Sequence, residues 1–104
     1  MKINFVVILI TCASGKEAQG IANSLLTKRM IACANIISGV QSKFWWRGRI
    51  DKAKEVLMLI KARADNFKAI EKEVKRMHSY EVAEIIALPI VRGSSDYLKW
   101  IAGQ

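Results

Sequence analysis

The sequence predicts a ferredoxin-like α+β fold, the split βαβ arrangement, in a single domain that covers residues 1–104. Three observations support this prediction. Hydrophobic periodicity places the elements in the order β-α-β-β-α-β, followed by a short helix. The connections are short, and right-handed crossovers then give a four-stranded antiparallel sheet with the two longer helices on one face. Hydrophobic residues make up 52% of the 104 positions, which suffices for a core without disulfide or metal staples.

The first strand and the first helix follow from the N-terminal part of the chain. Residues 3–10 are mostly β-branched or aromatic, which is typical of a strand buried on both faces. Ser14 and Glu17 have the S-x-x-E spacing of a capping box, in which each side chain satisfies a free N–H at a helix start. The following residues form one apolar stripe: Ala18, Ile21, Ala22, Leu25 and Leu26.

The middle of the chain predicts a long hairpin. Residues 31–46 form an extended segment, which Gly39 is expected to interrupt with a bulge or a bend. Residues 47–49 are the expected turn, because Gly48 can adopt a positive φ there. Residues 56–60 are apolar and flanked by charges, so we expect the third strand in this range.

The C-terminal part predicts two more helices and a strand. Asp65 is the expected cap of the second helix. The apolar stripe of that helix is Phe67, Ile70, Val74 and Met77. Residues 82–91 are the expected fourth strand, and Pro89 places that part at an edge or a bulge because proline donates no ladder hydrogen bond. Residues 93–96 begin the short last helix.

The predicted sheet leaves one face uncovered. Both longer helices pack on the same face, yet residues 5–9 carry apolar side chains of both parities. An uncovered apolar face needs a partner, and a second copy of the chain is the simplest one, so we expect a homo-oligomer. Trp45 and Trp46 are adjacent and point to opposite faces, so one of them is expected to pack against a partner subunit.

Thiol, imidazole and carboxylate groups suit soft and borderline metal ions, and they make five residues candidate ligands: Cys12, Cys33, His78, Glu81 and Glu84. The topology brings Cys12 to the same end of the sheet as His78, Tyr80 and Glu81. Cys33 begins the second strand at the opposite end, so the two thiols are not expected to bond or to share an ion within a subunit. The alternatives are buried cysteines that act as hydrophobic residues and a histidine that interacts with a helix dipole.

Several stretches together resemble the divalent-cation tolerance family, CutA. They span nearly the whole chain in the family's order and spacing: TCAS at 11–14, MIACANI at 30–36, SKFWWRG at 42–48, EVLMLIKAR at 55–63, HSYEVAEI at 78–85 and YLKW at 97–100. The family pattern usually has other residues at five positions: Phe44, Arg47, Ala62, Ser79 and Ala83. These departures alter the hairpin tip and the turn into the fourth strand, but they leave the fold prediction unchanged.

The resemblance implies a compact homotrimer in which the hairpin reaches into neighbouring subunits. It also implies tolerance of divalent metals, copper above all, with copper or another divalent cation as the only cofactor and no organic cofactor. Cys12, Cys33 and His78 fall where family members have been proposed to bind copper, and Glu81 and Glu84 lie in the same stretch as His78. The trimer resembles PII signalling proteins, which gives an alternative function: binding of a small anionic ligand at the subunit interface.

The formal net charge of +8 lies in residues 1–64, much of it around the hairpin. Such a charge suggests nucleic-acid binding. Residues 56–63, however, hold no aromatic side chain to stack a base, and an oligomer would bury the sheet face, so we expect no nucleic-acid partner. The predicted interface or ligand cleft comprises Phe44, Trp45, Trp46, Lys61, Arg63 and Tyr80.

Enzymatic and membrane functions find no support in the sequence. It contains no G-x-S-x-G, P-loop or H-E-x-x-H motif, so we expect no enzymatic activity. No apolar run approaches the roughly 20 residues of a membrane span, and the N-terminal residues are interpreted as a strand rather than a signal peptide. Two cysteines without CxxC spacing fit free thiols in a reducing compartment, so we expect a cytoplasmic protein.

Overall fold

The computed structural model describes residues 2–104 and contains the predicted elements in the predicted order. The elements are β1 (Phe5–Cys12), α1 (Gly15–Thr27), β2 (Cys33–Trp46), β3 (Arg49–Arg63), the 3₁₀ turn η1 (Ala64–Asn66), α2 (Phe67–Met77), β4 (Ile85–Pro89) and α3 (Ser95–Ala102). The strands form one sheet in the order β2-β3-β1-β4, and every neighbouring pair is antiparallel. The predicted α+β architecture and strand directions are therefore confirmed.

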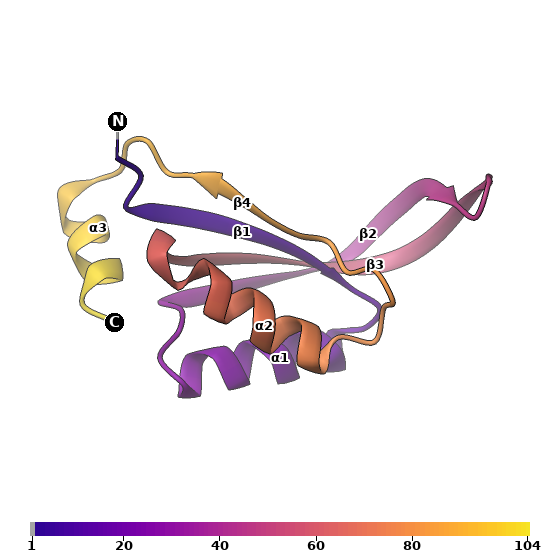
Figure 1. Ribbon diagram of the computed structural model, residues 1–104, viewed down its shortest axis with the longest axis horizontal. Coiled ribbons are helices and arrows are strands. Elements are labelled where there is room, and N and C mark those ends of the chain that lie inside the picture. The colour runs from indigo at the N-terminus through magenta and orange to yellow at the C-terminus, as the bar shows by residue number, and fades with distance from the viewer. Residues whose placement is uncertain (1) are drawn as a thin grey trace.

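Two helices cover one face of the sheet. Figure 1 shows α1 and α2 side by side below the strands, with α3 at the end of the sheet near the N-terminus. Burial alternates along β1, so that Ile8 and Ile10 are fully buried while Val7 and Leu9 are only half-buried. Only the helix-facing side of β1 is covered in the single chain, as expected, so burial of β1 on both faces depends on the expected homo-oligomer and stays a prediction.

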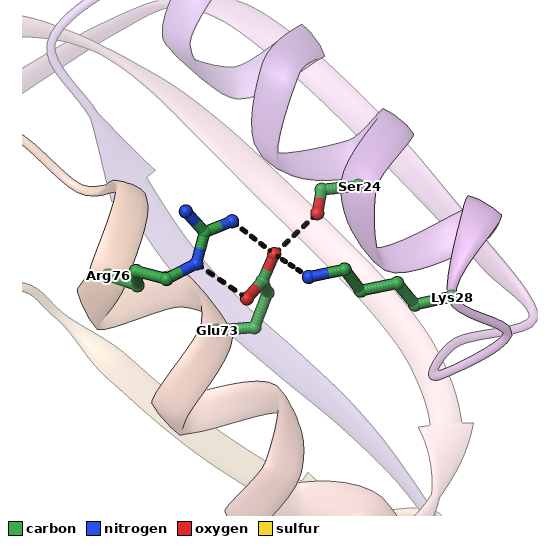
Figure 2. A network of polar contacts seen from close by, with 4 residues as sticks. All are labelled: Ser24, Lys28, Glu73 and Arg76. Carbon is green, nitrogen blue, oxygen red and sulfur yellow. Dashed lines mark hydrogen bonds and ion pairs between the residues drawn. The ribbon is translucent and has the colours of Figure 1, made fainter.

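A buried carboxylate joins the two helices at one point. Glu73 of α2 is 6% exposed, and its carboxylate accepts hydrogen bonds from Ser24 and Lys28 of α1 and from Arg76 of its own helix (Figure 2). Oε1 accepts from Arg76 alone, whereas Oε2 accepts from Ser24, Lys28 and Arg76, so both oxygens have partners, as a buried charge requires. The contact fixes the position of α2 relative to α1.

The start of α1 follows the sequence prediction, and the start of α2 does not. The Ser14 hydroxyl accepts the Glu17 N–H at 3.1 Å, and Glu17 in turn accepts the Ala13 N–H at 3.1 Å. Asp65, however, does not cap α2, because the 3₁₀ turn η1 leads straight into the helix and Asn66 at the N-cap is already helical, with φ −86° and ψ −5°. Asp65 instead lies 3.5 Å from Arg63.

The hairpin is longer than predicted and the fourth strand is shorter. β3 covers 49–63 rather than 56–60, because residues 49–55 pair with β2 in a two-stranded ribbon whose faces are mostly exposed and can carry charges. β4 covers 85–89 rather than 82–91, because its ladder with β1 ends where residues 79–84 leave the sheet edge. β1 covers 5–12 rather than 3–10, and β2 begins at residue 33 rather than 31 but ends at residue 46 as expected.

Two glycines adopt the backbone conformations that the sequence suggested. The register between β2 and β3 shifts between Ile37 and Val40, and Gly39 in this bulge has φ +80°. Gly48 has φ +79° in the turn, and Arg47 before it has φ +52°. Positive φ at both central residues is the requirement of a type I′ hairpin turn, so Arg47 adopts a conformation that usually favours glycine or asparagine.

The other sheet face is apolar and open in the single chain. Val7 pairs with Leu88 and Leu9 pairs with Ile86, and both β4 side chains are 49% exposed. We call the side chains of Val7, Leu9, Leu59, Ile86 and Leu88 the open face. No helix in residues 2–104 is long and apolar enough to cross a membrane.

Candidate functional site

Three potential metal-ligating side chains meet where β1 ends. Ligand atoms of Cys12, Glu17 and His78 all lie within 4.8 Å of one another. Cys12 is the last residue of β1, Glu17 lies in the first turn of α1, and His78 follows the last residue of α2. The structure thus confirms that Cys12 and His78 share one end of the sheet. We call these three residues the β1-end cluster.

Both ring nitrogens of His78 have main-chain partners. Nε2 lies 2.8 Å from the carbonyl oxygen of Thr11, and Nδ1 accepts the N–H of Tyr80 at 3.1 Å. Because a carbonyl oxygen can only accept, Nε2 carries the proton and the ring is the neutral Nε2–H tautomer. The ring also lies against Tyr80, with 4.9 Å between centroids. These contacts hold the loop after α2 against the end of β1.

Glu17 serves both the helix start and the loop after α2. Its Oε1 accepts the Ala13 N–H, and its Oε2 accepts the Ser79 N–H at 2.8 Å. Burial alone would raise the pKa of this carboxyl group, but the hydrogen bonds from Ser79 and Ala13 outweigh burial and lower the pKa. The carboxylate is therefore charged at neutral pH.

Cys12 is a buried, protonated thiol. Its side chain is fully buried, and its sulfur lies 3.7 Å from the Met58 sulfur. Burial raises the pKa of Cys12 to about 12, and the charges of Glu17 and Glu55 add to that effect. Met58 was absent from the predicted site, although the ladder pairs it with Ile10, next to Cys12 on the helix-facing side of the sheet.

The β1-end cluster fits a soft or borderline metal ion in the chemistry of its donors. A thiol, an imidazole and a carboxylate are suitable ligands for copper or zinc. As folded, however, the His78 nitrogens and the Glu17 oxygens are engaged in hydrogen bonds, and Cys12 keeps its proton. Metal binding here would have to replace at least one His78 hydrogen bond and release the thiol proton.

The other predicted ligands lie outside this cluster. Cys33 is at the opposite end of the sheet, 3.7 Å from the Tyr97 hydroxyl, and both cysteines are free thiols. Glu81 lies 3.5 Å from Arg47, and Glu84 lines a separate cleft. Glu17 takes the place that was expected for Glu81. The capping box was the sequence feature that could have indicated Glu17, because it places this residue in the first turn of α1, soon after Cys12 ends β1.

A cleft of about 750 Å³ lies between the base of the β2–β3 hairpin and residues 79–84. Among its lining residues are Trp46, Glu55 and Tyr80. The Tyr80 hydroxyl donates a hydrogen bond of 2.7 Å to Glu55, and burial together with this carboxylate raises the pKa of the phenol. We call this hollow the hairpin cleft.

The predicted interface residues divide between the two ends of the sheet. Phe44 and Trp46 line the hairpin cleft, whereas Trp45 is 71% exposed. Lys61 pairs with Cys33 in the ladder and donates a hydrogen bond to the Asn35 side chain, far from the cleft. Arg63 lies beyond it, beside Asp65. A single chain therefore does not bring Lys61 or Arg63 to the cleft.

Comparison with known proteins identifies the family. Residues 6–104 match the family model described as CutA1 divalent ion tolerance protein. The chain belongs to the CutA1 family. The divalent-cation tolerance protein CutA of Archaeoglobus fulgidus is 46% identical over 94 residues, which cover 90% of this chain and 91% of that protein. The resemblance drawn from the sequence motifs is therefore confirmed.

Other CutA1 relatives differ in length and setting. Protein CutA of the mouse is 41% identical over 92 residues, which are 88% of this chain but 52% of the mouse protein, so the chain spans about half of that relative. The solved structure of the periplasmic divalent cation tolerance protein CutA from Archaeoglobus fulgidus superposes with a TM-score of 0.93 at 43% identity, covering 95% of this chain and 96% of that one. The CutA1 fold therefore accounts for nearly all of the chain.

Proposed function

We propose that this protein acts as a homotrimer in the tolerance of divalent metal ions and that it binds copper directly at the β1-end cluster. The observation that carries the proposal is the convergence of Cys12, Glu17 and His78 ligand atoms within 4.8 Å. Membership of the CutA1 divalent ion tolerance family supports the metal-related role. Cys33, Glu81 and Glu84 are not part of the proposed site, because they lie elsewhere in the chain.

The chemistry of the cluster determines how such a site would respond to pH. Glu17 supplies a negative charge at neutral pH, whereas Cys12 must lose its proton to act as a thiolate ligand. Metal uptake would therefore release protons, and the affinity is expected to increase as the pH rises. Exposed sites made of carboxylates alone would show this dependence only at acidic pH.

A calorimetric titration with Cu²⁺ tests the direct-binding part of the proposal. The wild-type protein is expected to bind one ion per chain, and His78→Ala is expected to weaken binding at least tenfold because it removes a ligand. Cys33→Ser is the matched control, since that thiol lies at the opposite end of the sheet and its loss should leave the affinity unchanged. Absence of saturable binding by the wild type would show that the protein acts on metals indirectly.

The homotrimer is supported by the open face. Ile86 and Leu88 are large, apolar and 49% exposed, and they pair with half-buried residues of β1. A contiguous apolar surface of this kind is typical of a subunit interface. The exposed Trp45 and Ile50 on the hairpin, 71% and 68% exposed, are further candidates for contact with a neighbouring subunit.

A second candidate function is a PII-like signalling role, in which a small anion binds between subunits. The basic β2–β3 hairpin is the observation in its favour, because residues 43–54 hold five basic side chains and only one acidic side chain, Asp51. A site that also used Lys61 and Arg63 would need a second subunit to bring them close. A thermal-shift screen with nucleotides and organic anions tests this function, and a flat screen would count against it.

We further propose that the protein binds ligands rather than catalyses a reaction, and that it uses no organic cofactor. We also propose that it lies in the cytoplasm and has no nucleic-acid or membrane partner. The hydrogen bonds of the His78 ring go to main-chain atoms of Thr11 and Tyr80, and not to a side chain that the ring could activate as a nucleophile. Two free thiols support a reducing compartment. The Archaeoglobus protein is described as periplasmic, so cell fractionation is the direct test of location.

A further inference from the structure

The hairpin cleft contains a buried carboxylate without a cationic partner. Glu55 is 8% exposed and lines the cleft. Its Oε2 accepts the Tyr80 hydroxyl at 2.7 Å, but in residues 2–104 no lysine, arginine or histidine nitrogen lies within 4.0 Å of it. Buried carboxylates are normally paired, because removing a charge from water is costly. The cleft therefore presents a negative group that a bound cation could neutralise.

The remaining lining favours a cation larger than a metal ion. Acidic groups outnumber basic ones: the lining includes Asp51, Glu55, Glu81 and Glu84 against Lys43 and Lys52. In the described part of the chain, the β1-end cluster is the only group of at least three ligating side chains that converge within 4.8 Å, so the cleft carboxylates do not form a compact metal site. A volume of about 750 Å³ instead suits a small organic molecule.

The chain's own Arg47 indicates which organic cation the lining accepts. The carbon of its guanidinium group lies 5.4 Å from the centre of the Trp46 ring, and its Nη2 lies 3.5 Å from Glu81. Trp46 and Glu81 both line the cleft. Attraction between a cation and an aromatic face adds to the carboxylate contact. Both charged side chains are more than 70% exposed, so this contact is weak and leaves Glu55 unpaired.

We propose that the hairpin cleft binds a small organic cation that carries an amino or guanidino group. The cationic group pairs with the Glu55 carboxylate, and the carbon chain lies against the aromatic rings of Trp46 and Tyr80. Glu81 and Glu84 contribute further negative charge at the cleft. This site is separate from the proposed copper site and does not depend on it, because none of the β1-end cluster residues lines the cleft.

Calorimetric titration with agmatine, which carries one amino and one guanidino group, tests the proposal on the assembled wild-type protein. Agmatine is expected to bind saturably, whereas 1,5-pentanediol, a neutral diol without either group, is not. Glu55→Gln keeps the shape and the Tyr80 contact but removes the charge, so we expect at least a tenfold weaker affinity. Glu71→Gln is the matched control, because Glu71 lies on α2 with Lys75 as its partner and away from the cleft.

A second variant keeps the test decisive if Glu55→Gln does not fold. Trp46→Leu removes the aromatic face without touching a charge, and it should also weaken agmatine binding. Absence of saturable binding to the wild type, or equal affinity of the wild type and Glu55→Gln, would overturn the proposal. The proposal would also be overturned if Glu55→Gln lost oligomer mass and neither this variant nor the wild type bound agmatine. The cation that pairs with Glu55 would then come from a second copy of the chain.

Discussion

At the scale of single residues, Glu73 is the most strongly perturbed carboxylate in the described chain. Its oxygens accept two hydrogen bonds from Arg76 at 2.7 and 2.9 Å, one from Lys28 at 2.8 Å and one from Ser24 at 2.5 Å (Figure 2). The hydrogen bonds from Arg76, Lys28 and Ser24 hold the pKa of Glu73 well below its ordinary value of 4.5. The native state therefore binds fewer protons at this site than the unfolded state does.

The substitution Glu73→Gln is expected to make this linkage visible. A carboxyl whose pKa is lowered in the fold stabilises the protein above its unfolded pKa, and that stability disappears as the pH falls from 4.5 towards the folded value. The wild type should thus unfold at a higher urea concentration than Glu73→Gln at pH 7. The difference between the two urea midpoints should become smaller below pH 4.5. Urea titrations of both proteins between pH 7 and pH 3 measure it.

The control for this experiment is Glu71→Gln. Glu71 forms an exposed i,i+4 pair with Lys75 at 3.3 Å, and such pairs contribute little to stability. Its urea midpoint should stay close to that of the wild type at each pH. A gap between the wild type and Glu73→Gln that stays constant over the whole pH range would contradict the proposed role of the charge.

At the scale of elements, the hairpin turn shows how backbone conformation limits sequence choice. Gly48 has φ +79°, a region in which a Cβ atom is strained. Gly20 provides the opposite case, because it lies inside α1, where helical φ suits alanine and an added Cβ would meet nothing within 4 Å. The same chemical change should therefore act in opposite directions at these two glycines.

Gly48→Ala is expected to lower the free energy of unfolding by about 1 kcal/mol, because alanine is strained at positive φ. Gly20→Ala is expected to raise it by about 0.5–1 kcal/mol, because glycine in a helix interior loses more backbone entropy on folding. Urea unfolding at one fixed protein concentration compares both with the wild type. If both variants changed the free energy of unfolding in the same direction, the backbone conformation at the two glycines would not be the cause of the change.

The same elements show where sequence patterns are sufficient and where they are not. The capping box at Ser14 and the bulge at Gly39 are local devices, and the sequence predicts both correctly. The full length of β3 was missed, because residues 49–55 form a two-stranded ribbon that needs no apolar alternation. The prediction that Asp65 caps α2 was wrong because a 3₁₀ turn precedes that helix. An aspartate alone does not distinguish the start of a 3₁₀ turn from the start of an α-helix.

At the scale of the whole molecule, the candidate site combines a predictable part with an unpredictable one. The order of the elements alone brings Cys12 and His78 to one end of the sheet and Cys33 to the other. The second contact of Glu17, with the N–H of Ser79, joins residues 62 positions apart, and no spacing rule predicts it. The same holds for the hairpin cleft, where Tyr80 meets Glu55 across 25 positions.

The proposed assembly makes a prediction at this scale. The wild type should have a molar mass of about 35 kDa by light scattering after gel filtration, three times the 11.7 kDa of one chain. The double variant Ile86→Lys, Leu88→Lys places two ammonium groups on the open face, and burying them in an interface is costly. We expect this variant to elute as a single chain, because lysines on an exposed strand edge are well tolerated.

Leu26→Lys separates loss of the interface from a general effect of added charge. Leu26 is 42% exposed on α1, away from the open face, so this variant should keep the mass of the wild type. An unchanged mass of the double variant would exclude the open face as the interface, and a single-chain mass for the wild type would refute the trimer. Because the β1-end cluster lies within one chain, the dissociated variant should still bind one copper ion per chain, so the two parts of the proposed function can fail independently.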